Sequence, residues 1–223
     1  MKVRLISYST PAELPDYMRT PQELVAYCAR VSNPANQLNT ETSEKLIKYL
    51  IKHQHWSPLE MASACLEIET TRDIARQILR HRSFSFQEFS QRYADPVKDL
   101  DFEYRDCRLQ DTKNRQNSIE GADSDLQYAW YVAQRELIEK SKETYKWAID
   151  NGIAKEVARA VLPEGLTKSR MYMNGTLRSW IHYIQLRSAN GTQKEHMDIA
   201  KACALAITKI FPLTQELTAE SHD

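Results

Sequence analysis

The sequence predicts one domain that mixes helices with strands. The chain has 223 residues, of which 42% are hydrophobic, so it can bury one substantial core. Segments with alternating hydrophobic residues, typical of strands, are interspersed with segments that have helical spacing. No internal repeat, low-complexity tract or linker rich in Pro, Gly or Ser divides the chain. We therefore expect a single mixed α/β domain over residues 1–223.

The first predicted elements carry clear local signals. Residues 2–9 alternate as a half-buried strand does. The Thr-Pro-Gln-Glu capping box at residues 20–23 begins a helix that continues to residue 32. Residues 43–53 have helical spacing, and a second capping-box pattern, Ser-Pro-Leu-Glu at residues 57–60, predicts another helix start. In this interpretation Glu60 acts as a capping residue.

The remaining elements follow from the same two periodicities. Alternation predicts strands over 64–69 and 169–174, whereas helical spacing predicts helices over 72–82, 125–149, 156–159, 176–187 and 194–211. Asn151-Gly152 and Pro212 end two of these helices. Residues 106–125 are polar and rich in turn formers, so we expect an exposed loop there.

Composition excludes several classes of protein. The 30 basic and 30 acidic residues cancel, so the chain has no overall field that would attract nucleic acid or membranes. The closest two of the five glycines are ten residues apart, which excludes both the Rossmann fingerprint and the P-loop. Four cysteines without regular spacing, no apolar run of membrane-spanning length and no signal-peptide core predict a cytoplasmic protein with reduced thiols.

The strongest candidate for a binding site lies between Arg72 and Tyr93. Five arginines stand there against two acidic residues, in a protein that is neutral as a whole. Arginine forks match phosphate oxygens, and the neighbouring amides and hydroxyls can bind sugar hydroxyls or base edges. Together with Arg159, Arg178 and Arg187, these arginines predict a multiply anionic ligand.

This interpretation has four alternatives. The arginines could form a solvated helix face, or a basic helix could bind nucleic acid, although one short cluster gives little backbone affinity. His53, His55 and Glu60 could bind a metal, but no further ligand stands at a supporting spacing, so we expect no metal site. The serines of this region lack a nucleophile elbow, and no cysteine lies in it.

Residues 80–93 read RHRSFSFQEFSQRY and resemble the RHRxxSxNxxSxRY signature of the flavin-dependent thymidylate synthases. Seven of the eight fixed positions match, and Gln87 replaces the signature asparagine with a longer amide. Further segments agree with this family in order: 29–32, 55–60, 75–77, 156–163 and 178–187.

The resemblance implies the fold and the chemistry of that family. We expect helices around a mostly antiparallel sheet, and a homotetramer whose active sites are shared between subunits. FAD would be the cofactor, and NADPH and methylenetetrahydrofolate the co-substrates, in the reductive methylation of dUMP to dTMP. A catalytically silent regulator that binds flavin and nucleotide is the alternative. Surplus apolar residues on helices 125–149 and 194–211 agree with a tetramer.

The resemblance also implies roles for individual residues. The dUMP ligands would be Gln77, Arg80, Glu88, Ser90, Gln91, Arg92, Arg159 and Arg187. The FAD ligands would be Ser32, His55, Ser57, Arg80, His81, Arg82, Gln87, Glu88, Thr176, Arg178 and His182. Arg187 would be the catalytic group, because its fixed positive charge can stabilise the negative charge that develops on an activated uracil ring.

Overall fold

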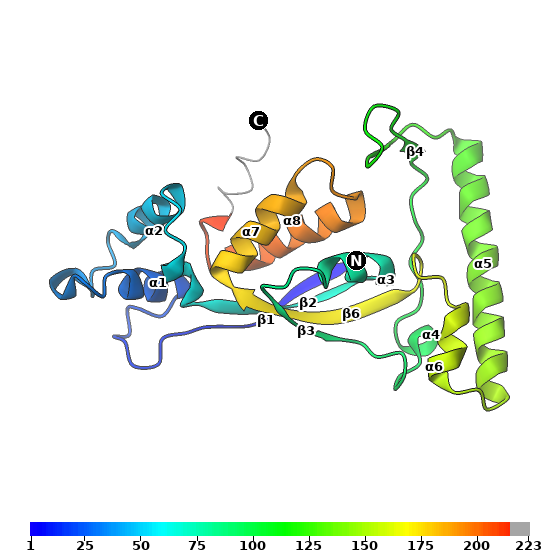
Figure 1. Cartoon of the computed structure of the whole chain (residues 1–223), viewed down its shortest axis with the longest axis horizontal. Helices are drawn as coiled ribbons and strands as arrows, with labels where there is room; N and C mark the ends of the chain where they lie inside the picture. The colour runs from blue at the N-terminus through cyan, green and yellow to red at the C-terminus, as the bar shows by residue number, and fades with distance from the viewer. Residues whose placement is uncertain (215–223) are drawn as a thin grey trace.

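A four-stranded antiparallel sheet forms the centre of the molecule in a computed structural model that describes residues 1–214 (Figure 1). Its strand order is β1 (Lys2–Tyr8), β2 (Ser63–Thr71), β6 (Lys168–Thr176) and β3 (Ser85–Glu88). Every neighbouring pair is antiparallel. The predicted mixed α/β class with an antiparallel sheet is confirmed, while the domain boundary predicted at residue 223 lies outside the described residues.

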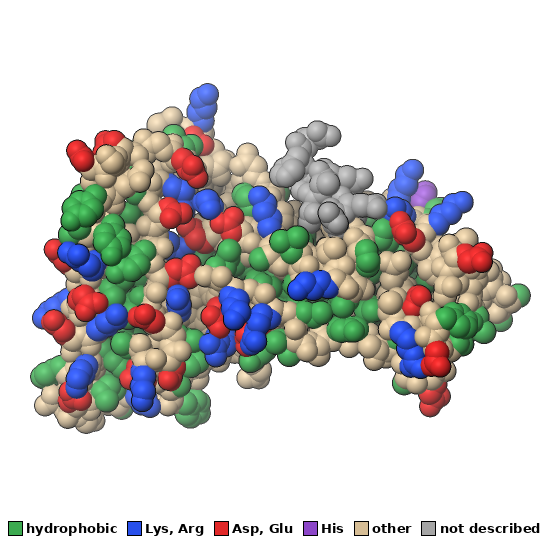
Figure 2. Space-filling view, turned by 180° about the vertical axis from the view of Figure 1, so that it is seen from behind, with side chains coloured by type: hydrophobic (Ala, Val, Ile, Leu, Met, Phe, Trp, Pro, Cys, Tyr) green, Lys and Arg blue, Asp and Glu red, His purple; other side chains and the backbone are tan. Residues whose placement is uncertain are grey.

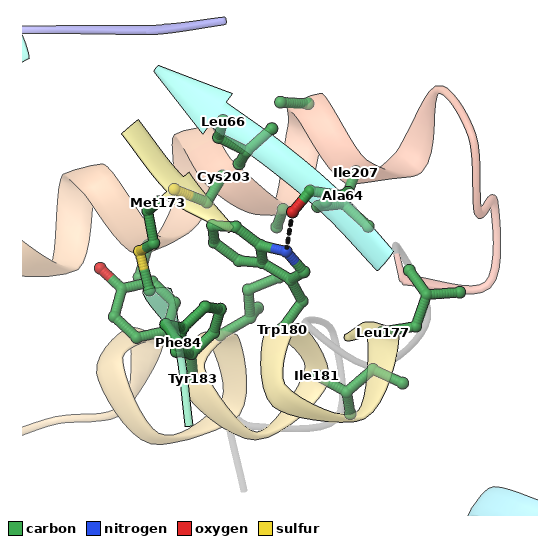
Figure 3. Packing of buried hydrophobic residues seen from close by; sticks show 14 of the residues in the cluster. Ala64, Leu66, Phe84, Met173, Leu177, Trp180, Ile181, Tyr183, Cys203 and Ile207 are labelled. Atoms are coloured by element: carbon green, nitrogen blue, oxygen red, sulfur yellow. Dashed lines mark hydrogen bonds between the residues drawn. The ribbon is translucent and has the colours of Figure 1, made fainter. Parts of the chain in front are cut away.

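Helices α7 (Leu177–Ser188) and α8 (Lys194–Thr208) cover one face of the sheet and build the main core with it. Trp180 is fully buried at its centre, and its indole Nε1 donates a 3.0 Å hydrogen bond to the carbonyl of Ala64 on β2 (Figure 3). This bond satisfies the one polar atom of a large buried side chain. It also ties α7 to the middle of the sheet.

The backbone of β6 at Gly175 lies close to Phe84, in the segment just before β3. A Cβ atom at this position would lie 2.3 Å from the Phe84 ring, which packs edge-on against Trp180. Only glycine leaves room for that ring. The aromatic cluster therefore fixes where the chain turns from α3 into β3.

The N-terminal helices lie at one end of the sheet, on the left in Figure 1. They are α1 (Pro21–Ala29), the 3₁₀ turn η1 (Pro34–Asn36), α2 (Ser43–Lys52) and the 3₁₀ turn η2 (Ser57–Glu60). The capping box of α1 is confirmed, since the Thr20 side chain accepts from Glu23 and Glu23 accepts from Thr20. The second capping box is wrong: η2 is a single turn, and no side chain caps its N-terminus.

The long helix α5 (Ser124–Asp150) stands at the opposite end of the molecule. It packs with α6 (Lys155–Ala158) and the 3₁₀ turn η3 (Arg159–Val161) around a second, smaller core that includes Ile138 and Tyr145. The short helix α4 (Pro96–Asp99) lies beside them. Within residues 1–214, no helix combines the length and apolar character needed to cross a bilayer.

Further parts of the chain differ from the sequence prediction. Helix α3 (Arg72–Ile78) ends four residues before the predicted boundary at residue 82, and the chain then enters the strand β3. The pattern did not reveal β3 because its partner β6 lies far away in the sequence. Inside the predicted loop 106–125, β4 (Leu109–Gln110) and β5 (Ser118–Ile119) form a small hairpin.

Candidate active site

The turn that follows α3 contacts the C-terminal end of α7. Here the Nε of Arg187 donates a 2.9 Å hydrogen bond to the Nε2 of His81. Burial, together with the charges of Arg187 and Arg80, lowers the pKa of His81 to about 4, so its imidazole is neutral at pH 7. Only a neutral imidazole can accept this bond, and the bond therefore holds the guanidinium of Arg187 in a defined orientation.

Gln77 lies on the last turn of α3, close to this pair. Its Nε2 donates a 2.8 Å hydrogen bond to the Oε1 of Gln193, at the start of α8. Glu88, at the end of β3, accepts from the hydroxyl of Ser169 at 2.8 Å. The structure thus brings Gln77 onto the edge of the main core, and it holds the carboxylate of Glu88 in place.

Glu88 also faces two arginines of α3. The guanidinium nitrogens of Arg72 and Arg76 lie 3.9 and 3.7 Å from its carboxylate, and both arginines also pair with Glu164. Of the five arginines in the cluster, Arg72 and Arg76 therefore have structural partners. Arg80 and Arg82 are exposed and make no ion pair with another residue of the described chain.

Ser90, Gln91 and Arg92 follow β3 and lie near the start of η3. The Nε of Arg92 is 3.4 Å from the carboxylate of Glu156, while the Nε of Arg159 donates to the backbone carbonyl of the same residue at 3.3 Å. The structure thus brings two of the predicted dUMP ligands together around one residue. Glu156 thus forms an ion pair with Arg92, whereas Arg159 contacts only its backbone.

Gln91 has a buried amide nitrogen without a partner in residues 1–214. Its side chain is 3% exposed, and its Nε2 has no hydrogen-bond partner among the described residues. A buried amide nitrogen without an acceptor costs about 1–3 kcal/mol, unless a ligand or a partner supplies the acceptor. A phosphate or sugar oxygen would satisfy it.

The predicted flavin ligands of η2 and α7 also meet. The ring of His182 packs edge-on against Trp56, with centroids 4.4 Å apart, and Arg178 forms a 2.5 Å ion pair with Glu60. His55 and Ser57 flank Trp56 in sequence and are exposed. Glu60 therefore orients Arg178, and its predicted capping role is wrong.

The other predicted flavin ligands have different surroundings. Thr176 caps α7, because its hydroxyl accepts from the backbone N–H of Ser179. Ser32 lines a cavity of about 460 Å³ between α1 and α2, and Tyr49 on its wall packs near the His55 ring. Gln87 is exposed on the face of β3 opposite the main core.

Sequence reasoning missed three side chains of this region. Trp56, Tyr183 and His196 contact predicted ligands but carry no motif of their own. The position of His196 on α8 was the available signal, because it shares a helical face with buried Ile199 and Cys203. Across residues 1–214, no three His, Cys, Asp or Glu side chains are grouped closely enough to hold a metal ion.

The fold and these side chains together define a mixed α/β protein whose predicted ligand-binding arginines lie around α3, α7 and η3. Comparison with known proteins identifies the family. The model of the family described as thymidylate synthase complementing protein matches residues 13–213. This chain belongs to that family.

Individual relatives agree over nearly the whole chain. A probable flavin-dependent thymidylate synthase of Paramecium bursaria Chlorella virus 1 is 50% identical over 212 residues, which cover 95% of this chain and 96% of the relative. The flavin-dependent thymidylate synthase of Synechocystis is 48% identical over 213 residues, with the same coverage. Among solved structures, a UMP/dUMP methylase, PolB from Streptomyces cacaoi bound with 5-Br dUMP, superposes with a TM-score of 0.78 at 25% identity, covering 98% of this chain and 94% of the other.

Proposed function

We propose that this enzyme methylates dUMP reductively to dTMP. Methylenetetrahydrofolate would donate the carbon, and NADPH would supply the reducing equivalents by way of FAD. The observation that carries the proposal is the signature at residues 80–93, seven of whose eight fixed positions match, in a chain that belongs to this family. The names of its relatives support both the flavin and the thymidylate product.

The flavin ligands suit an anionic, planar cofactor. Arg80 and Arg82 have no carboxylate partner among the described residues, so their guanidiniums are free to bind phosphate oxygens. The packed rings of Trp56 and His182, the second of which is close in sequence to Arg178, would contact the planar ring system of the flavin. When bound, the flavin supplies the hydride chemistry, and the protein's part is to hold and tune it.

The ligands proposed for dUMP suit a phosphate. Arg92 and Arg159 both contact Glu156 through their Nε atoms. The other N–H groups of the two guanidiniums are therefore available to phosphate oxygens. The amide nitrogen of Gln91, the sequence neighbour of Arg92, has no partner among the described residues and supports a ligand acceptor in this segment. The Ser90 hydroxyl accepts weakly from the backbone N–H of Arg92, at 3.4 Å, and stays available to donate.

Arg187 would activate the uracil ring through its charge. A guanidinium keeps its proton near neutral pH, so it presents a fixed positive charge where an activated uracil becomes anionic. Neutral His81 holds the Nε of Arg187 and leaves the two terminal nitrogens for the substrate. The His81 imidazole thus orients the proposed catalytic guanidinium without adding a competing positive charge.

We also propose a homotetramer in the cytoplasm, with active sites shared between subunits. The side chains of Tyr128 and Trp147 on α5 are 68% and 60% exposed, a large apolar surface for a monomer. Figure 2 shows hydrophobic side chains gathered over this end of the molecule. Helix α8 gives less support than its sequence suggested, because Ile199 and Ile207 are buried in the main core.

A visible spectrum and a product assay test the proposed function together. Purified protein should show flavin absorbance near stoichiometry, and it should convert dUMP to dTMP when methylenetetrahydrofolate and NADPH are present. Protein that holds flavin and binds dUMP but makes no dTMP would support the silent regulator. A colourless protein that binds duplex DNA with steep salt dependence would support a nucleic-acid binder instead.

A further inference from the structure

A chain of five side chains runs from α7 through α3 to the start of α8. The hydroxyl of Tyr183 lies 3.2 Å from the Nε2 of His196, and the Nδ1 of His196 lies 3.2 Å from the Oε1 of Gln77. The Nε2 of Gln77 donates to Gln193 at 2.8 Å, and the Nε2 of Gln193 donates to the carboxylate of Glu195 at 3.0 Å.

The carboxylate at one end sets the direction of every bond in this chain. Burial by itself would raise the pKa of Glu195, but the hydrogen bond from Arg108 and the charge of Arg105 bring it to about 2. An ionised carboxylate can only accept, so the amide nitrogen of Gln193 must face it. The Gln193 oxygen is then left to accept from the amide nitrogen of Gln77.

The same logic determines the tautomer of His196. With its nitrogen turned toward Gln193, Gln77 presents its oxygen to His196, and the Nδ1 of His196 must carry a proton to donate to it. His196 is fully buried, and burial with the nearby Arg187 and His81 lowers its pKa to about 3, so the ring carries only that proton. Its Nε2 then accepts from the Tyr183 hydroxyl.

Gln77 therefore has one orientation with all its partners satisfied. If its amide flipped, its nitrogen would face the Nδ1–H of His196 and its oxygen would face the oxygen of Gln193. The contact with Gln193 would be repulsive in either tautomer of His196, and buried polar groups would lose their partners. In the observed orientation Gln77 keeps one N–H and one oxygen lone pair for a ligand.

We propose that His196 is a positioning residue that locks the Gln77 amide in the orientation that binds the nucleotide. The inference rests on the proposed function, in which Gln77 contacts dUMP. His196 does not touch the substrate in this account and acts only through Gln77. Because Gln77 binds ground state and transition state alike, loss of the lock should raise the KM for dUMP and leave kcat nearly unchanged.

Two amide variants of His196 separate positioning from packing. The amide nitrogen of Asn reaches the place of Nδ1, so His196→Asn keeps the bond to Gln77. The amide of Gln reaches the place of Nε2, so His196→Gln keeps the Tyr183 contact and loses the bond to Gln77. We expect about a tenfold higher KM for dUMP in His196→Gln, which corresponds to about 1.4 kcal/mol, and a KM within about twofold of the parent in His196→Asn.

The dUMP dissociation constant, kcat, FAD content and melting temperature should be measured for the parent and both variants. Equal dUMP affinity in the two variants would overturn the inference, because it would show that His196 only fills space. A parent that fails to bind dUMP would contradict the proposed function as well. The two failures are thereby distinguished.

Glu195→Gln tests the same chain from its carboxylate end and keeps the length of the side chain. An amide can both donate and accept, so Gln193 and Gln77 are free to flip together, and the KM for dUMP should rise by about two- to fivefold. This variant also replaces His196→Gln if that protein does not fold. A folded Glu195→Gln protein with unchanged KM and dUMP affinity would contradict the proposed lock.

Discussion

Helices α7 and α5 both have aromatic residues at helical spacing, but these residues are buried in α7 and exposed in α5. Among the 12 residues of α7, the aromatic side chains of Trp180 and Tyr183 are buried in the main core. On the 27 residues of α5, Tyr128, Tyr131 and Trp147 remain largely exposed, although they too stand at helical spacing. Helical periodicity reports that a face is apolar, and it does not report what covers that face.

The comparison also shows where chemistry gathers. The buried face of α7 is held on the sheet by Trp180, so its other positions can present Arg178, His182 and Arg187 in fixed directions. Helix α5 has only a small core beneath it, and its charged residues pair mainly within the helix, as Lys146 does with Asp150. A binding or catalytic site needs a helix packed on the sheet, as α7 is, because precise positioning of side chains requires a rigid support.

The largest expected effect comes from removing the proposed catalytic group of α7. Arg187→Ala should lower kcat for dTMP formation by about 10²- to 10³-fold, about 2.7–4 kcal/mol, because a fixed charge at the developing anion is lost. Arg187→Lys keeps the charge without the planar fork and should lose less. The measurement is dTMP formation at saturating dUMP.

FAD content and NADPH oxidation without folate serve as controls for the Arg187 variants, and both should change little. If Arg187→Ala holds FAD and still forms dTMP within a few-fold of the parent rate, Arg187 only anchors His81. In that case the C-terminal end of α7 would have a structural role and no catalytic one.

A single added methyl group at Gly175 should disrupt the packing beneath α7. Gly175→Ala places a methyl group 2.3 Å from the Phe84 ring, so that ring and Trp180 must shift. We expect a loss of about 1–3 kcal/mol in the free energy of unfolding, measured by denaturant titration. Gly165→Ala is the matched control, because the atom nearest to its added Cβ, an oxygen of Asp73, lies 3.9 Å away. Equal stability of the two variants would contradict the tight approach.

Acid should weaken the network at the C-terminal end of α7. The pKa values of His81 and His196 are about 4 and about 3 in the folded protein, below the ordinary value of 6.5. Between pH 6.5 and 4 the unfolded chain therefore binds more protons, and the free energy of unfolding decreases as the pH falls. Each histidine should contribute on the order of 1 kcal/mol between pH 7 and 5.

Denaturant unfolding at pH 7, 6 and 5 measures this dependence. Glu195, with a pKa of about 2, contributes only below about pH 4.5, so it does not obscure this range. His196→Asn should show a shallower decrease because it removes one of the two titrating rings. A parent protein whose stability is constant from pH 7 to 5 would show that these histidines are not held neutral.

The smallest effect on folding is expected on α5. Replacing Tyr128 and Trp147 together with Ser should change the free energy of unfolding of a subunit by less than about 0.5 kcal/mol per site, because both side chains are largely exposed. The same change should dissociate the proposed tetramer, as light scattering at micromolar concentration would detect. A parent that is monomeric and fully active would refute the tetramer.

Local signals in the sequence were sufficient wherever a few neighbouring residues decide the structure. The capping box at Thr20 and Glu23 predicted the start of α1, and helical spacing predicted α5 to within one residue at each end. The signature at residues 80–93 identified the family, because it depends only on residue types and spacing. Such features need no knowledge of distant contacts.

Features that depend on distant partners were decided by the tertiary structure alone. Strand β3 exists because its backbone pairs with β6, more than eighty residues away, and Glu60 pairs with Arg178 instead of capping a helix. The neutral state of His81 depends on burial and on Arg187, and the orientation of Gln77 depends on a carboxylate at residue 195. Residue identity sets which side chains are available, whereas burial and long-range hydrogen bonds set their protonation and direction.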